Sequence, residues 1–134
     1  MPGALLPFFI YWGVLVAVCV VFLTCPVLFI VILPLLLIIV PLWLIAAYLV
    51  GDAVQRRGRL EGAARRMALS LLCSFLVIAV YPVGFWLYDA VQWNAFEIGS
   101  LVRSFSDRPL WIIFALHVLM FWAGEEIGHT ATKE

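Results

Sequence analysis

Apolar residues fill the first fifty positions of the chain almost without interruption. Asp, Glu, Lys and Arg are absent before Asp52, between Arg66 and Asp89, and between Arg108 and Glu125, so every charge falls in one of three clusters. A bilayer core about 30 Å thick is crossed by roughly 20 apolar residues in a helix. Long charge-free stretches separated by charged clusters therefore predict membrane-spanning helices.

The first charge-free stretch, residues 4–50, is too long for a single crossing. As one helix it would measure about 70 Å, more than twice the hydrocarbon thickness. We expect a turn at Thr24-Cys25-Pro26, because proline lacks a backbone donor and disfavours helix in the residue before it. The result is two spans of about 4–23 and 27–50. The alternative is a re-entrant hairpin, since Pro34 and Pro41 each free a carbonyl group that needs a partner in lipid.

Two further spans are expected at about 67–88 and 110–124, the latter short enough to require local thinning of the bilayer. Between them, residues 92–107 carry an apolar stripe at helical spacing that is typical of a helix lying in the membrane interface. The stripe consists of Ile98, Leu101, Val102 and Phe105. The predicted fold is an all-α integral membrane protein with a single domain, 1–134. It is a four-helix transmembrane bundle, whose first two spans form a proline-rich hairpin, plus one interfacial amphipathic helix.

Composition excludes a small soluble domain. Hydrophobic residues make up 66% of the chain and charged residues 12%, and the mean hydropathy is +1.16. Soluble domains are nearer half apolar and a quarter charged. The eight basic and eight acidic residues cancel, so the net charge indicates no nucleic-acid partner.

Orientation follows from the arginines. The predicted loop 51–66 contains only two acids, Asp52 and Glu61, against five arginines: Arg56, Arg57, Arg59, Arg65 and Arg66. Short loops rich in arginine stay on the cytoplasmic side, and we expect these five side chains to face lipid headgroups there. An even number of crossings on either side then places both termini in the cytoplasm. The expected location is a plasma or inner membrane.

Catalytic motifs are not evident in the sequence. It contains no nucleophile–base pair, phosphate-binding glycine loop or two-cysteine metal motif at a usable spacing. The three cysteines lack C-x-x-C spacing, so they are interpreted as small apolar side chains within or beside spans. The sequence therefore predicts a protein that is not an enzyme and needs no cofactor.

His117 is the one ionisable residue in the middle of a predicted span. Such residues are functional candidates, because burying a charge in lipid is costly. We favour a neutral imidazole that hydrogen-bonds a neighbouring helix. The alternatives are a haem ligand, a proton relay or a quinone contact, which would make His117 a cofactor-binding residue.

The sequence E-E-I-G-H places Glu125, Glu126 and His129 on one face of a continuing helix. Di-iron bundles use a Glu-x-x-His pair, but they need it twice together with two more carboxylates. This chain has it once, so the three residues are weak metal candidates and a solvated helix end is the favoured interpretation. Gly124 and Gly128 have the G-x-x-x-G spacing of a close helix crossing.

These features favour a non-enzymatic accessory, anchoring or assembly subunit of a larger membrane complex. The expected partners are the lipid bilayer and either other membrane proteins or further copies of this chain. One alternative is a small oligomeric channel or transporter. Another is an immunity or inhibitor protein that binds a membrane-inserted toxin or another membrane protein. Architecture alone does not separate these classes.

Overall fold

Four long helices form most of the protein. The computed structural model describes residues 3–133, and the side chains of these except for Pro26, Phe29, Ile32, Leu33 and Leu36. No strand occurs within that range. The elements are α1 (Leu6–Thr24), α2 (Pro26–Ile32), the 3₁₀ turn η1 (Leu33–Leu35), α3 (Leu36–Gly58), α4 (Ala63–Trp93), α5 (Ile98–Ser104) and α6 (Arg108–Lys133). Helices α1, α3, α4 and α6 are long and apolar enough to cross a membrane. The predicted all-helical, multi-pass membrane architecture is confirmed at this level.

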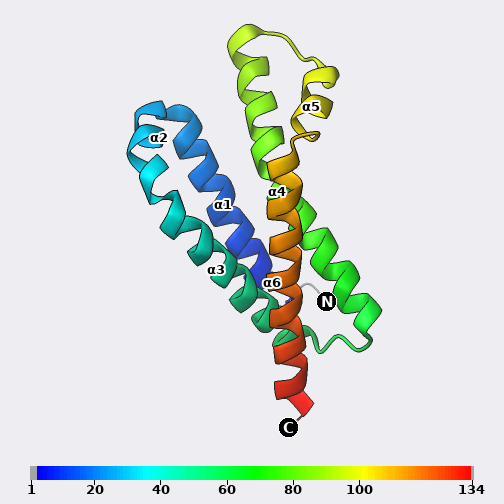
Figure 1. Cartoon of the computed structure of the whole chain (residues 1–134). Coiled ribbons are helices and arrows are strands. Elements are labelled where there is room, and N and C mark those ends of the chain that lie inside the picture. Colours follow the sequence, from blue (N-terminus) through cyan, green and yellow to red (C-terminus); the bar gives the residue numbers. More distant parts are fainter. Residues whose placement is uncertain (1–2, 134) are drawn as a thin grey trace.

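The first apolar stretch folds back on itself as a hairpin (Figure 1). Helix α1 has 19 residues and α3 has 23, about 28 and 35 Å of helix. Both lengths match the hydrocarbon core, which favours two crossings over a re-entrant hairpin. The turn differs from the prediction: after Cys25, helix α2 and η1 connect the two arms, so the second spanning helix begins at Leu36 and not near residue 27.

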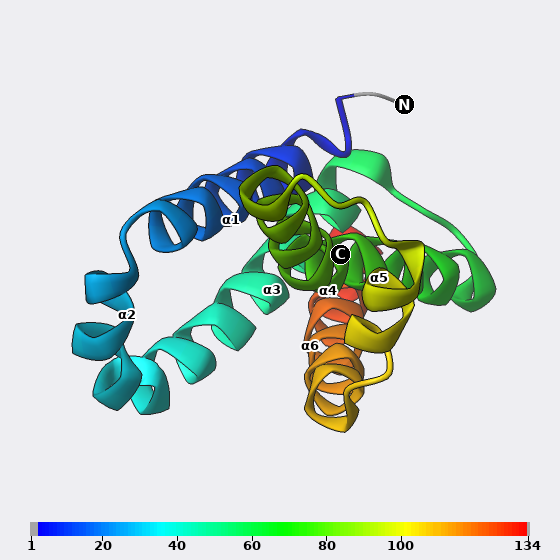
Figure 2. The same ribbon diagram turned by 90° about the horizontal axis from the view of Figure 1, so that it is seen from above.

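Prolines explain the wide turn of this hairpin. Pro26 is the first residue of α2, where the missing N–H costs nothing because no intrahelical acceptor exists there. Pro34 lies inside η1, and its ring prevents a regular helix from running through it. Figure 2 shows the turn lying well away from α4, α5 and α6.

The other boundaries also move relative to the sequence prediction. The loop expected at 51–66 is mostly helical, because α3 continues to Gly58 and α4 begins at Ala63. Helix α6 spans 26 residues and extends past the predicted span 110–124 at both ends. The interfacial helix expected at 92–107 is reduced to α5, since α4 continues to Trp93.

Glycine allows α3 and α6 to cross with their backbones in contact. A Cβ atom added to Gly124 would collide with the carbonyl oxygen of Tyr48 and lie 2.9 Å from the amide nitrogen of Asp52. A Cβ on Gly51 would collide with the carbonyl oxygen of Phe121, and one on Gly128 would lie 2.9 Å from the carbonyl oxygen of Asp52. The G-x-x-x-G sequence of α6 therefore marks a close helix crossing, as predicted.

Most of the packing between helices lies at one end of the molecule. The start of α1, the end of α3, the start of α4 and the second half of α6 meet there, around the connection 59–62 (Figure 1). We call this the arginine end, because the loop arginines lie there. The apolar core in this half consists of Phe8, Val54, Cys73, Val77 and Phe121. Both termini of the described chain lie in the same half of the molecule (Figure 1).

Candidate functional site

Two rows of side chains with four-residue spacing face each other across α4 and α6. Residues four apart share one face of a helix. In α4 the row is Arg66, Ser70 and Ser74, and in α6 its polar members are His117 and Glu125, with Glu126 beside them. Because the helices run in opposite directions, Ser74 meets His117 while Arg66 meets Glu126. We call these six residues the polar seam.

His117 lies at the deepest level of the polar seam and is completely buried. Its Nδ1 atom is 2.7 Å from Ser74 Oγ, and its Nε2 atom is 2.9 Å from the Tyr11 hydroxyl. Trp43 and Phe121 pack against the ring, with centroids 5.5 and 6.3 Å away. A neutral imidazole has one donor and one acceptor nitrogen, and the two hydroxyls engage both. His117 therefore ties α6 to α1 and α4, and it could ligate iron only by giving up one of these contacts.

Glu125 forms the middle level. Its side chain is fully buried, and its Oε2 atom accepts a hydrogen bond of 2.7 Å from Ser70 Oγ. Its Oε1 atom has no hydrogen-bond partner in the described part of the chain. The solvated helix end expected from the sequence is thus wrong for Glu125, because α6 continues past it and packs it against α4.

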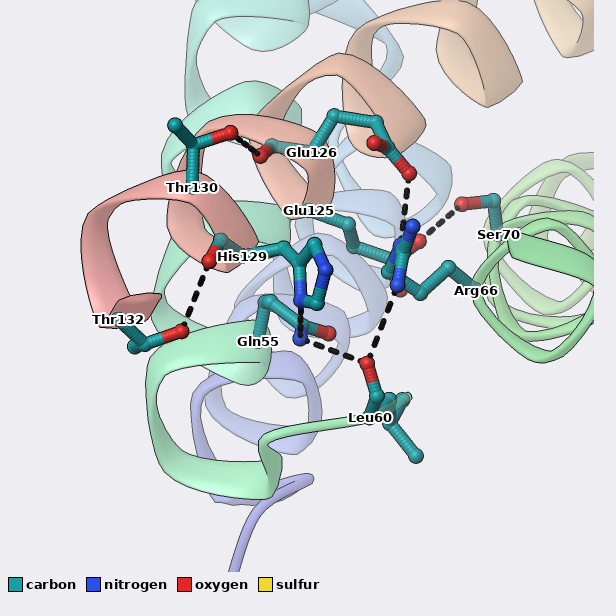
Figure 3. A network of polar contacts seen from close by, with 9 residues as sticks. All are labelled: Gln55, Leu60, Arg66, Ser70, Glu125, Glu126, His129, Thr130 and Thr132. Carbon is teal, nitrogen blue, oxygen red and sulfur yellow. Dashed lines mark hydrogen bonds and ion pairs between the residues drawn. The ribbon is translucent and has the colours of Figure 1, made fainter. Parts of the chain in front are cut away.

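The outer level is an ion pair at the arginine end (Figure 3). The Nε atom of Arg66 donates to Glu126 Oε1 at 2.6 Å, and its Nη1 atom donates to the carbonyl oxygen of Leu60 at 3.2 Å. The Arg66 side chain is 6% exposed and that of Glu126 36%. The guanidinium group of Arg66 is therefore much more deeply buried than the carboxylate of Glu126.

Gln55 brings α3 into the same network. It is fully buried, its Nε2 atom donates to the carbonyl oxygen of Leu60 at 2.9 Å, and the same atom lies 3.5 Å from His129 Nδ1 (Figure 3). Its Oε1 atom is buried and lacks a hydrogen-bond partner within residues 3–133. The network therefore connects α3, α4, α6 and the 59–62 connection.

The three weak metal candidates do not converge. Glu125 contacts Ser70, Glu126 contacts Arg66, and His129 lies beside Gln55. No group of three or more His, Cys, Asp or Glu side chains in the described residues has the arrangement of a metal site. Instead, Glu125 and Glu126 both contact α4 and His129 contacts α3, which holds the helices together.

The five arginines of the predicted loop fall into three environments. Arg66 turns inward to Glu126, and Arg56 pairs with Asp52 one helical turn away at 2.9 Å. Arg57, Arg59 and Arg65 are exposed, and no hydrogen bond or ion pair is found for their side chains in the described chain. These three side chains are the ones free to meet lipid headgroups.

Sequence reasoning missed the partners of His117 and Glu125. Ser70 and Ser74 are four apart within an otherwise apolar stretch, and Arg66 precedes Ser70 by the same interval. That spacing is the signal of a polar helix face, and it would have indicated a polar contact for α4. It would not have identified the neighbouring helix.

Comparison with known proteins identifies no relative of this chain. No protein-family model matches it, and searches of curated proteins and of solved structures find no similar protein.

We expect the variant His117→Gln to lose little stability. A glutamine amide keeps a donor and an acceptor for Tyr11 and Ser74, and polar pairs inside membranes contribute only about 0.6 kcal/mol on average. His117→Leu should cost more, because it leaves both buried hydroxyls without their partner. Unfolding in detergent micelles measures the difference. A different outcome is that the His117→Gln variant assembles normally but the complex containing it loses activity. That result would instead indicate that His117 takes part in redox or proton transfer.

Proposed function

We propose that this protein is a non-enzymatic accessory, anchoring or assembly subunit of a larger membrane complex and that it acts through helix–helix contacts. The supporting observation is the uneven packing of its spans. In the most apolar window of α1 only 6% of the residues are buried inside the molecule, against 33% in α4 and in α6. The polar seam joins α4 to α6 and the glycine crossing joins α3 to α6, while α1 and the outer half of α3 present most of their surface outward.

The exposed face of α1 suits a partner helix. Gly13 and Ala17 are four apart on this face, and a Cβ atom added to Gly13 would have nothing within 4 Å. Val14, Val18 and Val21 flank them and are 58%, 43% and 50% exposed. Small residues at four-residue spacing let two helix backbones approach closely, and that packing drives helix association in lipid. The surface therefore fits a transmembrane helix of another protein.

The proposed orientation places the arginine end in the cytoplasm. Arg57, Arg59 and Arg65 are exposed there, and basic residues beside spans are retained on the cytoplasmic side. Both termini then lie in the cytoplasm. The proposed location is a plasma or inner membrane, where such an orientation rule applies.

Co-purification tests the proposed function. We expect the tagged protein, extracted in mild detergent, to carry a stoichiometric membrane protein with it. The double variant Gly13→Ile and Ala17→Ile should recover about tenfold less of that protein, because bulky side chains keep the helices apart. Ala115→Ile is the matched control, because it adds the same side chain to an exposed position of another span, α6.

Other outcomes would contradict the accessory role. Recovery of a homo-oligomer that releases ions from proteoliposomes would favour a channel or transporter. Recovery of a single membrane-active toxin would favour an immunity protein. Equal loss of the partner in the Ala115→Ile control would show that the α1 face is not the docking surface.

A further inference from the structure

A cavity of about 460 Å³, open to the outside, lies at the arginine end between the residues just before α1, the end of α3, the 59–62 connection and the start of α4. Its walls are almost entirely apolar, and they include Leu5, Val54, Leu60, Leu69 and Leu72. Binding sites for small molecules have volumes of about 300–1,000 Å³ and are mostly apolar with a few polar groups. The size and the lining therefore suit one small or chain-like apolar ligand group.

Arg65 is the one charged residue that lines the cavity. It is exposed, and no carboxylate within residues 3–133 forms an ion pair with it. Its neighbours Arg56 and Arg66 are both neutralised, by Asp52 and Glu126. An apolar cavity with an uncompensated guanidinium group is complementary to an anionic amphiphile, because the guanidinium binds phosphate oxygens in bidentate fashion.

We propose that this cavity binds one anionic phospholipid molecule. The headgroup phosphate contacts Arg65, and part of an acyl chain lies against Leu69 and Leu72 on α4 and Leu5 before α1. A phospholipid is favoured over a soluble phosphate because eight of the nine lining residues are apolar. The location agrees, since basic residues beside a span meet the anionic lipids of the cytoplasmic leaflet.

The bound lipid would stabilise the position of α1. Beyond its apolar contacts, α1 is attached to the other spans by Tyr11, which contacts His117, and by Trp12, whose Nε1 donates to the carbonyl oxygen of Leu76 at 3.1 Å. The cavity is lined by the residues just before α1, by α3, by the 59–62 connection and by α4. A lipid chain filling it would add contacts between α4 and the residues that lead into α1. This inference does not depend on the accessory role, so the two fail separately.

The experiment uses the full-length protein, purified in detergent and stripped of lipid. Phosphatidylglycerol, phosphatidylcholine and inorganic phosphate are added separately, and native mass spectrometry counts the retained molecules while the melting temperature is recorded. We expect one phosphatidylglycerol molecule to be retained and to raise the melting temperature. Equal retention of phosphatidylcholine, or an equal effect of inorganic phosphate, would overturn the proposal.

Three variants locate the site. Arg65→Gln should weaken phosphatidylglycerol binding about fivefold, the effect of one basic residue near a lipid surface. Ala68→Phe should abolish retention by filling the cavity, which Ala68 lines. Arg57→Gln removes the same charge from the same end of the molecule but does not line the cavity, so it should bind as the parent does. Equal weakening by Arg57→Gln would show diffuse attraction and overturn the proposed site.

Discussion

Replacing Gly124 with alanine is expected to separate α3 from α6, although the change adds a single methyl group. The new Cβ would collide with the carbonyl oxygen of Tyr48 and lie 2.9 Å from the amide nitrogen of Asp52. Both atoms belong to the backbone of α3, so neither is able to rotate away. Overpacking typically costs about 1–3 kcal/mol and occasionally more, and we expect about 3 kcal/mol here. Unfolding of the purified protein in mixed micelles measures the loss.

Gly13→Ala is the matched control for this prediction. A Cβ atom on Gly13 would have nothing within 4 Å, and alanine is the better helix former by about 1 kcal/mol. We expect its stability to equal or exceed that of the parent protein. Equal destabilisation by both substitutions would show that the backbones of α3 and α6 are not in contact at Gly124.

Removal of Glu126 is expected to destabilise the protein more than removal of its partner Arg66. The variant Glu126→Ala leaves a guanidinium group whose side chain is only 6% exposed without its carboxylate. Breaking a buried pair in this way costs about 3 kcal/mol. In Arg66→Met the remaining carboxylate is 36% exposed and is hydrated instead, so we expect about 1 kcal/mol.

The double variant Arg66→Met with Glu126→Ala completes the thermodynamic cycle. We expect it to be more stable than Glu126→Ala alone, because it no longer contains a buried guanidinium group without a carboxylate partner. The unfolding free energies of the three variants in micelles give the coupling between the two residues. Equal losses in the two single variants, with no recovery in the double variant, would contradict the asymmetric burial of this pair.

Several features of this fold follow from the sequence by itself. The charge-free stretches identify the apolar part of each span, because a lipid core excludes unpaired charge and satisfies no backbone group. The length of residues 4–50 requires a turn, which the structure places after Thr24. The Gly124 and Gly128 spacing identifies the face of α6 that approaches another helix, since only glycine leaves room for backbone contact.

The tertiary structure alone decides where the helices end. Helix α3 continues through Arg56 and Arg57, and α6 continues through Glu125 and Glu126. Hydropathy marks the part of a helix that fits the hydrocarbon core, whereas the helix itself continues while its backbone hydrogen bonds remain internal. Charged residues therefore marked the limits of the apolar stretches and not the limits of the helices.

The partners within the polar seam likewise depend on the tertiary structure. The pairs Ser74–His117 and Ser70–Glu125 join residues 43 and 55 positions apart, and they form only because α4 and α6 are neighbours in this register. The spacing of polar residues along one helix fixes which of them share a face. The choice of facing helix is set by the packing of α4 against α6, which no spacing within a single helix determines. That is why the sequence identified His117 and Glu125 as candidates but left their partners undetermined.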